Sequence, residues 1–351
     1  MPVLVNESRL PALLLPGWSL DRRSQQTVIV KATCNFDLDG HLTLADQQPP
    51  LVLTDAYRDE PTASSLLQAS EVGPFKQTAE FYLFGTAHPA HPDDTSTTTT
   101  VSLQGPDWQL RKTLLVVGQH RWKRGLTGLT RGPIEPLQPT ALTYELTYGG
   151  MDPKTGTRLA DNPAGRGYNP GGRLLNNTDA PCIEYESEFK ANFSGGNRPA
   201  GYAPLPVQWA PRYRRLGEPL SEQALNQSVC PWGDAVDPRV HHCAPDDQQL
   251  PTFITGGEQL YLEGFFAGSQ RSVELTLPSA FTQVRLYRQQ ATAETYTLAC
   301  DTLLIDTDKK QLSLLYRAAL PTQSVMMDAN DGWLVVSPHV GPQFNESYDA
   351  N

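Results

Sequence analysis

The stretch TVIVKATCNFDLDGHLTL, residues 27–44, decides the fold class of this chain. From Val28 to Leu38 the apolar side chains recur at every second position, which is the period of a β-strand with one face toward a core. Asp39-Gly40 interrupts this alternation, which then resumes through Leu44. Because Asp-Gly suits the positive φ angles of a type I′ turn, the stretch predicts a β-hairpin.

The same strand period appears on both sides of a long central region. Residues 80–118 are rich in Thr, Val and Leu, and Val273–Leu277 alternates between apolar and polar side chains. Further on, residues 302–305 and 311–317 flank a polar loop that is typical of a hairpin. We therefore predict a mostly β protein with little helix, in which the N- and C-terminal thirds form antiparallel, sandwich-like sheets.

The region between these strands is rich in Gly, Pro and Asn and poor in helical periodicity, with one short helix predicted over Ser221–Val229. A length of 351 residues exceeds the roughly 100–200 residues of a usual domain, so one enlarged domain and two lobes both stay open. We expect an N-terminal β region over residues 1–131, a loop region over 132–250, a C-terminal β region over 251–335 and a tail over 336–351.

The charge and the cysteine content argue against nucleic acid and against secretion. Acidic residues outnumber basic ones by 38 to 28, and the net charge of −10 repels a polyanion. The five cysteines are an odd number spread over a long chain, which fits reduced thiols in the cytoplasm. Met1–Trp18 has no basic n-region and is interrupted by prolines, so we expect neither a signal peptide nor a membrane span.

Three common catalytic motifs are incomplete in this sequence. After Gly156, Thr157-Arg158 stands where a phosphate-binding loop needs Lys and then Ser or Thr to reach phosphate and metal. After Gly165-Arg166-Gly167, Pro170 takes the place of the third glycine of a dinucleotide-binding loop. The Gly-x-Ser-x-Gly elbow of serine hydrolases does not occur. We therefore expect no cofactor and no catalytic residues.

Two clusters leave an enzymatic alternative open. On a strand, His241 and Cys243 would share one face as part of a metal site, and Glu184, Glu186 and Glu188 would line one edge as carboxylates for glycoside chemistry. The first cluster has too few ligands, and carboxylates on one edge cannot flank a bond from two sides. A polar loop and a solvated strand face are the simpler interpretations. A carbohydrate-active or metal-dependent β-sheet enzyme is thus the alternative function.

The central region has the composition of a shaped binding surface. The run from Tyr144 to Glu184 combines dense turn residues with aromatic residues, which ordinary linkers do not do. Trp209 and the basic cluster around Tyr213, as well as Arg121-Trp122, are of the residue types that concentrate binding energy at protein interfaces. In a net acidic chain, these clusters favour a partner protein over nucleic acid.

A set of short segments occurs in order along most of the chain. The segments are Lys31-Ala32-Thr33, Pro74-Phe75-Lys76, Gly118–Trp122, Leu142–Glu145, Gly149-Gly150, Asn162–Gly167, Ile183-Glu184, Pro199–Tyr202 with Trp209 and Arg212, Ala244–Asp246, Gly256–Glu258, Asp301-Thr302 and Leu315–Arg317. This ordered set resembles a bacterial family encoded beside VgrG spike genes and PAAR-type effector genes in type VI secretion clusters. The chain departs most from the family pattern over Val229–His242.

The resemblance implies a cytoplasmic adaptor or chaperone of a Gram-negative bacterium. Such a protein would stabilise a type VI effector with a PAAR or PAAR-like domain and help load it onto the VgrG spike, without catalysis or metal. An internal role for Asn162 and Arg166, holding the loops in place, is an alternative, as is a component that travels with the spike. The candidate partner-binding residues are Arg121, Trp122, Tyr148, Gly149, Gly150, Asn162, Gly165, Arg166, Gly167, Glu184, Trp209 and Arg212.

Overall fold

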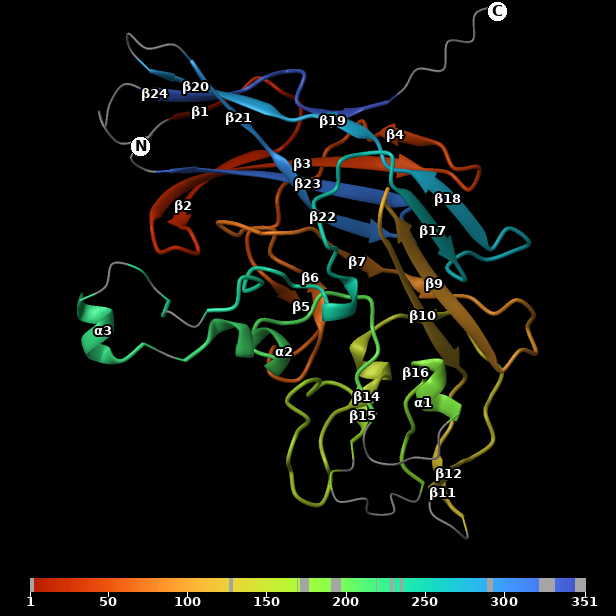
Figure 1. Ribbon diagram of the computed structural model, residues 1–351. Coiled ribbons are helices and arrows are strands. Elements are labelled where there is room, and N and C mark those ends of the chain that lie inside the picture. Colours follow the sequence, from red (N-terminus) through yellow and green to blue (C-terminus); the bar gives the residue numbers. More distant parts are fainter. Residues whose placement is uncertain are drawn as a thin grey trace, which may run out of the picture.

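The computed structural model describes residues 3–125, 129–168, 170, 177–190, 197–218, 220–227, 230, 232–233, 236–288, 293–321 and 332–344. Strands make up 42% of the structure and helices 7%, which confirms the predicted mostly β class. Figure 1 shows several sheets in its upper half and a loop-rich part below them.

A six-stranded sheet combines strands from the two ends of the chain. Its order is β2-β3-β23-β22-β7, with β4 paired to β3. The strands β3 and β23 run antiparallel, from Asn35 opposite Gln311 to Gln25 opposite Pro321, so the prediction that both ends build the sheets is confirmed. The pair β22–β7 is parallel, unlike the predicted antiparallel arrangement. The bounds are β2 Ala12–Trp18, β3 Ser24–Phe36, β4 Leu42–Leu44, β7 Glu80–Phe84, β22 Ala299–Asp306 and β23 Gln311–Pro321.

A five-stranded sheet again joins early and late strands. Its order is β16-β10-β9-β17-β18, and every pair in it is antiparallel. In Figure 1 the strands β9, β10, β17 and β18 lie at the right of the molecule. The bounds are β9 Ser96–Gln104, β10 Gln109–Val117, β16 Ile183–Glu184, β17 Gln259–Glu263 and β18 Ser272–Thr276.

A four-stranded sheet and five two-stranded pairs complete the strands that the described residues form. The four-stranded sheet has the order β1-β24-β20-β21, in which β1 and β24 are parallel. Its strands are β1 Val3–Asn6, β20 Gln283–Arg288, β21 Glu294–Thr297 and β24 Gly332–Val336. The pairs are β5 Ala56–Tyr57 with β6 Leu66–Gln68, β8 Thr86–Ala87 with β13 Thr140–Ala141, β11 Trp122–Arg124 with β12 Leu129–Arg131, β14 Tyr148–Gly149 with β15 Arg166–Gly167, and β19 Ser279–Phe281 with β25 Gly341–Gln343.

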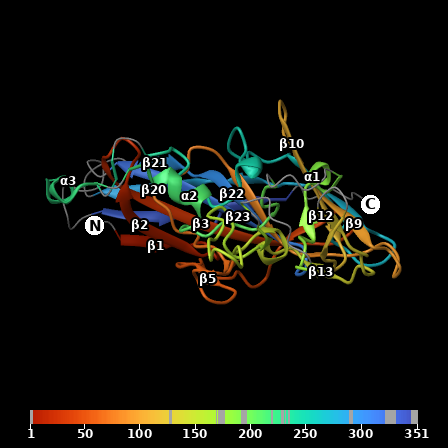
Figure 2. The same cartoon turned by 90° about the horizontal axis from the view of Figure 1, so that it is seen from below.

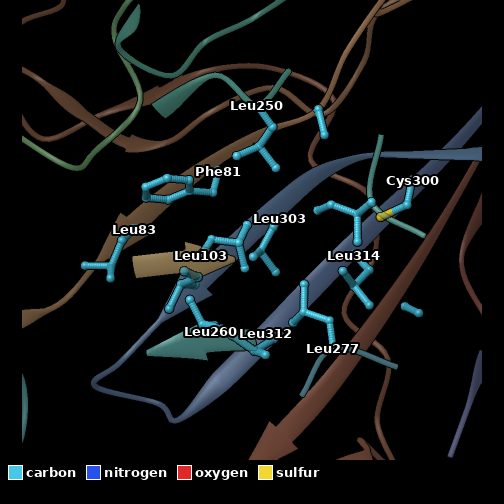
Figure 3. Packing of buried hydrophobic residues seen from close by; sticks show 14 of the residues in the cluster. Phe81, Leu83, Leu103, Leu250, Leu260, Leu277, Cys300, Leu303, Leu312 and Leu314 are labelled. Atoms are coloured by element: carbon cyan, nitrogen blue, oxygen red, sulfur yellow. The ribbon is translucent and has the colours of Figure 1, made fainter. Parts of the chain in front are cut away.

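One hydrophobic core joins the six-stranded and the five-stranded sheets. Leu303 of β22 and Leu312 of β23 pack in one cluster with Leu103 of β9 and Leu260 of β17, and all four side chains are at most 1% exposed (Figure 3). Burying one Leu side chain stabilises a fold by roughly 1.5–3 kcal/mol, so this shared cluster holds the two sheets together.

The first hairpin forms where it was predicted, with a different turn. The strand β3 ends at Phe36, β4 pairs with it, and the loop between them spans residues 37–41. Only Gly40 in this loop has a positive φ, 93°, whereas a type I′ turn needs two such residues. The predicted turn type is therefore wrong, because the Asp37 carboxylate accepts the N–H groups of Asp39 and His41 and so holds a longer loop.

Helices are short and lie outside the two large sheets. They are α1 Glu186–Lys190, α2 Ala210–Tyr213, α3 Glu222–Gln227 and the 3₁₀ turns η1 Tyr144–Leu146, η2 Arg214–Leu216 and η3 Asp246–Gln248. The predicted helix is confirmed by α3, although Val229 lies outside the described residues. Within the described part of the chain, every helix is too short to cross a membrane. Viewed from below, the loops between β11 and α2 lie nearest the viewer (Figure 2).

Candidate functional site

The loop-rich part is organised around the side chain of Asn162, which is fully buried. Its Nδ2 atom lies 2.9 Å from the carbonyl oxygen of Tyr144, 2.8 Å from Thr147 Oγ1 and 3.1 Å from the carbonyl oxygen of Tyr148. Its Oδ1 atom accepts the N–H of Ala164 at 3.2 Å. One amide thus ties the segment 144–148 to the turn 162–164.

Glycines let these two segments approach closely. The parallel pair β14–β15 places Gly149 opposite Gly167, and both residues have positive φ, 154° and 80°. A Cβ atom added at Gly165 would lie 2.5 Å from Asn162 Nδ2 and 2.6 Å from the carbonyl oxygen of Thr147. Such distances exclude any side chain here, so the glycines of this motif serve contacts inside the loop region.

Trp209 anchors a second segment to the same scaffold. Its side chain is 1% exposed, and its ring centroid lies 5.3 Å from that of Tyr144 in an edge-on contact. The neighbouring Arg212 donates from Nη1 to the carbonyl oxygen of Leu205 at 2.8 Å. Both residues therefore fasten the α2 segment to the protein interior.

A third group surrounds the guanidinium of Arg131. Arg131 Nη1 lies 2.8 Å from Glu184 Oε2, and its guanidinium stacks 4.9 Å from the centre of the Trp122 ring. Burial raises the pKa of Glu184, although the charge of Arg131 opposes this shift. By contrast, Arg121 is exposed and lies 3.1 Å from the Asp179 carboxylate.

Arg166 connects the segment around Asn162 to the segment that contains Gln119. Its Nε atom donates to the carbonyl oxygen of Glu145 and its Nη1 atom to Gln119 Oε1, each at 3.1 Å. These contacts bring the predicted residues together, and we call this arrangement of the loop region the scaffold. The side chains of Trp122, Tyr148, Asn162, Glu184 and Trp209 are buried within it. The internal alternative is the arrangement observed for Asn162 and Arg166, while contact with a partner stays a prediction.

The predicted row of three carboxylates is wrong. Glu184 ends the short strand β16, whereas Glu186 and Glu188 belong to the helix α1, so the three side chains do not line one strand edge. Carboxylates in the first turn of a helix interact favourably with its positive end, which favours the helix here. Glu188 is further held by Arg198, whose Nε atom lies 2.8 Å away.

The predicted strand geometry of His241 and Cys243 is also wrong, because neither residue belongs to a strand. His241 packs edge-on against Phe75 with ring centroids 4.7 Å apart, while the N–H of Cys243 donates to Glu80. Burial raises the pKa of the Cys243 thiol, which disfavours the thiolate that binds metals. Among the described residues, the metal-like group is an exposed one, Asp37 with Asp39 and His41.

Chelation should therefore leave the protein unchanged. We expect purified protein to contain less than stoichiometric zinc, and EDTA to leave its Tm unchanged, because burial disfavours the Cys243 thiolate and the thiol already donates to Glu80 Oε1. Elemental analysis and thermal unfolding measure both quantities. Stoichiometric zinc that disappears in Cys243→Ser would contradict this expectation, and Cys34→Ser, also buried, is the matched control.

Three buried ion pairs beside the six-stranded sheet are the feature that sequence reasoning missed. Lys31 Nζ lies 2.6 Å from Glu71 Oε1, Lys76 Nζ lies 2.5 Å from Glu80 Oε1, and Arg317 pairs with Asp301. Each of these side chains is at most 7% exposed. Buried charges are costly unless paired, and here each positive charge meets one negative charge.

Hydrogen bonds link the pairs into one network. Thr302 Oγ1 accepts from Lys76 Nζ at 2.6 Å and donates to Asp301 Oδ1 at 2.8 Å. Arg317 Nη2 donates to the carbonyl oxygen of Glu71 at 3.1 Å. We call this set of Lys31, Glu71, Lys76, Glu80, Asp301, Thr302 and Arg317 the buried ion network.

A signal for this network exists in the sequence. Lys31 interrupts the apolar run Val28–Ala32, and Arg317 follows Leu314-Leu315-Tyr316 on a strand with the same character. A cation inside a strand that is buried on both faces needs a buried acid, which single-strand periodicity cannot locate. Lys31, Lys76, Asp301, Thr302 and Arg317 all fall in the segments that carry the family resemblance.

Comparison with protein families agrees with a bacterial origin. Residues 21–317 match the model of a family described as an uncharacterized protein conserved in bacteria, DUF2169. The chain belongs to this family. Searches of curated proteins and of solved structures found no match. The matched range covers the five-stranded sheet, the loop region and the six-stranded sheet except for β2 and the end of β23. The scaffold and the buried ion network therefore both lie within the DUF2169 match.

The scaffold presents an exposed surface of mixed apolar and basic character. Met151 faces Arg158 across a β-bridge, the Arg214 guanidinium lies 3.2 Å from the Asp161 carboxylate, and the N–H of Ala210 donates to the carbonyl oxygen of Ala160. These contacts place residues 160–161, which directly follow the hairpin 150–159, beside α2 and η2. We define the α2 face as Met151, Arg158, Val207, Tyr213, Arg214 and Leu216, all of which are exposed.

Proposed function

We propose that this protein is a cytoplasmic, non-enzymatic adaptor that binds a type VI effector with a PAAR or PAAR-like domain and helps load it onto the VgrG spike. The observation that carries the proposal is the α2 face, on which Tyr213 is 54% and Leu216 41% exposed beside the arginines. The resemblance described above supplies the identity of the partner.

The chemistry of the α2 face suits a polypeptide partner. Tyr and Arg are enriched among the residues that dominate binding energy at protein interfaces, and exposed apolar side chains gain by burial against a partner. The buried scaffold beneath the surface, with Asn162 and Trp209 at its centre, fixes the loops before binding. A surface that is ordered beforehand loses less conformational entropy on association, which favours affinity.

The direct test is co-expression with the PAAR-type protein encoded beside this chain. We expect the effector to become more soluble and to co-purify with the adaptor in a pull-down. An effector that is equally soluble alone and does not co-purify would rule out the adaptor function. Culture fractionation separates an adaptor, which stays cellular, from a component that leaves with the spike.

The double variant Tyr213→Ala with Arg214→Ala should weaken effector capture by at least about tenfold, since both side chains are exposed anchors. Affinity is measured by calorimetry, with thermal unfolding recorded for each variant. Trp333→Ala is the matched control, because Trp333 is 43% exposed on the four-stranded sheet, outside the α2 face. Equal losses in both variants would exclude the α2 face as the docking surface.

A further inference from the structure

The five-stranded sheet carries a groove of about 390 Å³ that none of the roles above uses. Side chains from the four neighbouring strands β10, β9, β17 and β18 line it. Their apolar neighbours Leu103, Leu262 and Leu275 are buried in the core, so the groove lies on the solvent side of the sheet. Its rim carries Gln104, Gln109, Arg111, Gln259, Tyr261 and Glu274.

The strand register explains the hollow. Arg111, Ser102, Tyr261 and Glu274 are successive cross-strand partners and form one row across the sheet. Ser102, the smallest of the four, stands between Arg111 and Tyr261 and forms the floor. The neighbouring row consists of Gln109, Gln104 and Gln259.

The polar groups of the groove are suited to hydroxyl groups. A Gln side chain offers donors and an acceptor together, and the groove presents three such amides along one side. Gln259 already donates to the carbonyl oxygen of Gly257 and accepts from Thr276 Oγ1, and Gln109 donates to Ser102 Oγ. Each of these two amides keeps a second N–H for a ligand. The side chains of Gln104 and Arg111 donate no hydrogen bond to another described residue, so both can bind a ligand without breaking a protein contact. The ring of Tyr261 adds an apolar surface between the charged ends.

Other ligand classes fit less well. The charges of Arg111 and Glu274 cancel, so the groove attracts neither a polyanion nor a polycation. An apolar ligand would remove the amides from water without replacing their hydrogen bonds. The backbone groups of β9 are paired with β10 on one side and β17 on the other, so an extended peptide cannot add as a further strand here.

We propose that this groove is a binding site for a neutral saccharide. The sugar hydroxyls bond to Gln104, Gln259 and Arg111, and one sugar ring packs against Tyr261. The site is separate from the α2 face, and the proposal does not depend on the adaptor function.

The test titrates the full chain with cellobiose, maltose and N,N′-diacetylchitobiose, and with digalacturonate and ATP as charged probes, by calorimetry. We expect saturable binding of at least one neutral disaccharide below about 10 mM and weaker binding of the charged probes. Gln104→Ala with Gln259→Ala should weaken that binding about tenfold. Gln68→Ala, an exposed glutamine on β6, is the matched control and should leave the affinity unchanged.

Three results would overturn the proposal. They are the failure of all three neutral disaccharides to saturate the protein, tighter binding of digalacturonate or ATP than of any neutral sugar, and unchanged affinity in the double variant at an unchanged Tm. Effector capture is measured separately on the same variants, and its loss or retention bears only on the adaptor function.

Discussion

Replacing Glu80 by Ala is expected to lower the free energy of unfolding by about 3–5 kcal/mol, because it leaves buried groups without a partner. The Glu80 carboxylate is completely buried, lies 2.5 Å from Lys76 Nζ and accepts the N–H groups of Cys243 and Ala244 at 3.1 and 2.8 Å. Its loss would leave the Lys76 ammonium without a negative charge beside it and the N–H groups of Cys243 and Ala244 without their acceptor, all away from water. Urea unfolding followed by tryptophan fluorescence measures the change.

Two further variants separate this explanation from simple loss of packing. Glu80→Ala combined with Lys76→Met should be less destabilised than Glu80→Ala alone, since no uncompensated charge then remains buried. Lys309→Ala breaks the exposed pair with Asp306 and should change stability by less than about 1 kcal/mol. If the double variant is as unstable as the single one, the charge of Lys76 is not the cause.

Glu80 should also make the free energy of unfolding depend on pH. Burial alone would raise the pKa of Glu80, but the charges of Lys76 and His242 and the hydrogen bonds from Lys76 and Ala244 lower it from 4.5 to about 2. Since the folded pKa is the lower one, the stabilisation is complete above pH 4.5 and is lost as the pH falls toward 2. Stability measured between these values should therefore depend less steeply on pH in Glu80→Ala than in the parent protein.

Two histidines add to acid sensitivity at higher pH. Burial lowers the pKa of His241 from 6.5 to about 3 and that of His242 to about 4. The folded protein binds protons at these two positions less readily than the unfolded chain does, so stability should begin to fall once the pH drops below 6.5. The comparison with Glu80→Ala is therefore made between about pH 3 and pH 2, where both histidines are already protonated and the Glu80 carboxylate still titrates.

Strand periodicity predicted the fold class because the main strands are long and alternate. The alternation in β3 predicted that Val28, Val30 and Ala32 face the core, where they lie. β3 pairs with β23, which is a second long strand from the opposite end of the chain. Periodicity failed for Glu186 and Glu188, because an alternating polar pattern over only five residues suits a solvated strand and a short helix equally.

The site residues could be selected from the sequence, but which of them are exposed could not be predicted from it. Trp209 and Arg212 stand in a segment typical of an interface, and only the tertiary contacts show that Trp209 packs on Tyr144 while Tyr213 faces outward. The acid that pairs with a buried cation was equally hidden: Lys31 of β3 pairs with Glu71, which belongs to no strand. The bond from Arg317 to the carbonyl oxygen of Glu71 joins residues 246 positions apart. Sequence patterns over short windows do not contain such long-range partners.

Replacing Asn162 by Ala should lower the free energy of unfolding by about 2–4 kcal/mol, because four polar groups of the loop region lose a hydrogen bond at once. The carbonyl oxygens of Tyr144 and Tyr148, the Thr147 hydroxyl and the N–H of Ala164 all bond to this amide. Asn162→Asp has the same shape but turns a carboxylate toward the two carbonyl oxygens, so we expect at least as large a loss. Asn35→Ala, at an exposed position of β3, is the matched control and should change stability by less than about 0.5 kcal/mol.

The Asn162→Ala variant also tests whether binding at the α2 face depends on the scaffold. Asn162 is proposed to hold the loops that present Tyr213 and Arg214. Asn162→Ala should therefore lose effector capture at a temperature where the two large sheets are still folded. Hydrogen exchange should increase first over residues 144–167. Exchange of the amides in β3 and β23 reports on the sheets, since their backbone hydrogen bonds lie in the centre of the six-stranded sheet. Full capture by a variant whose loop amides exchange freely would show that the ordered scaffold is not needed for binding. Loss of capture with unchanged loop protection would instead place Asn162 in direct contact with the partner, contrary to its burial.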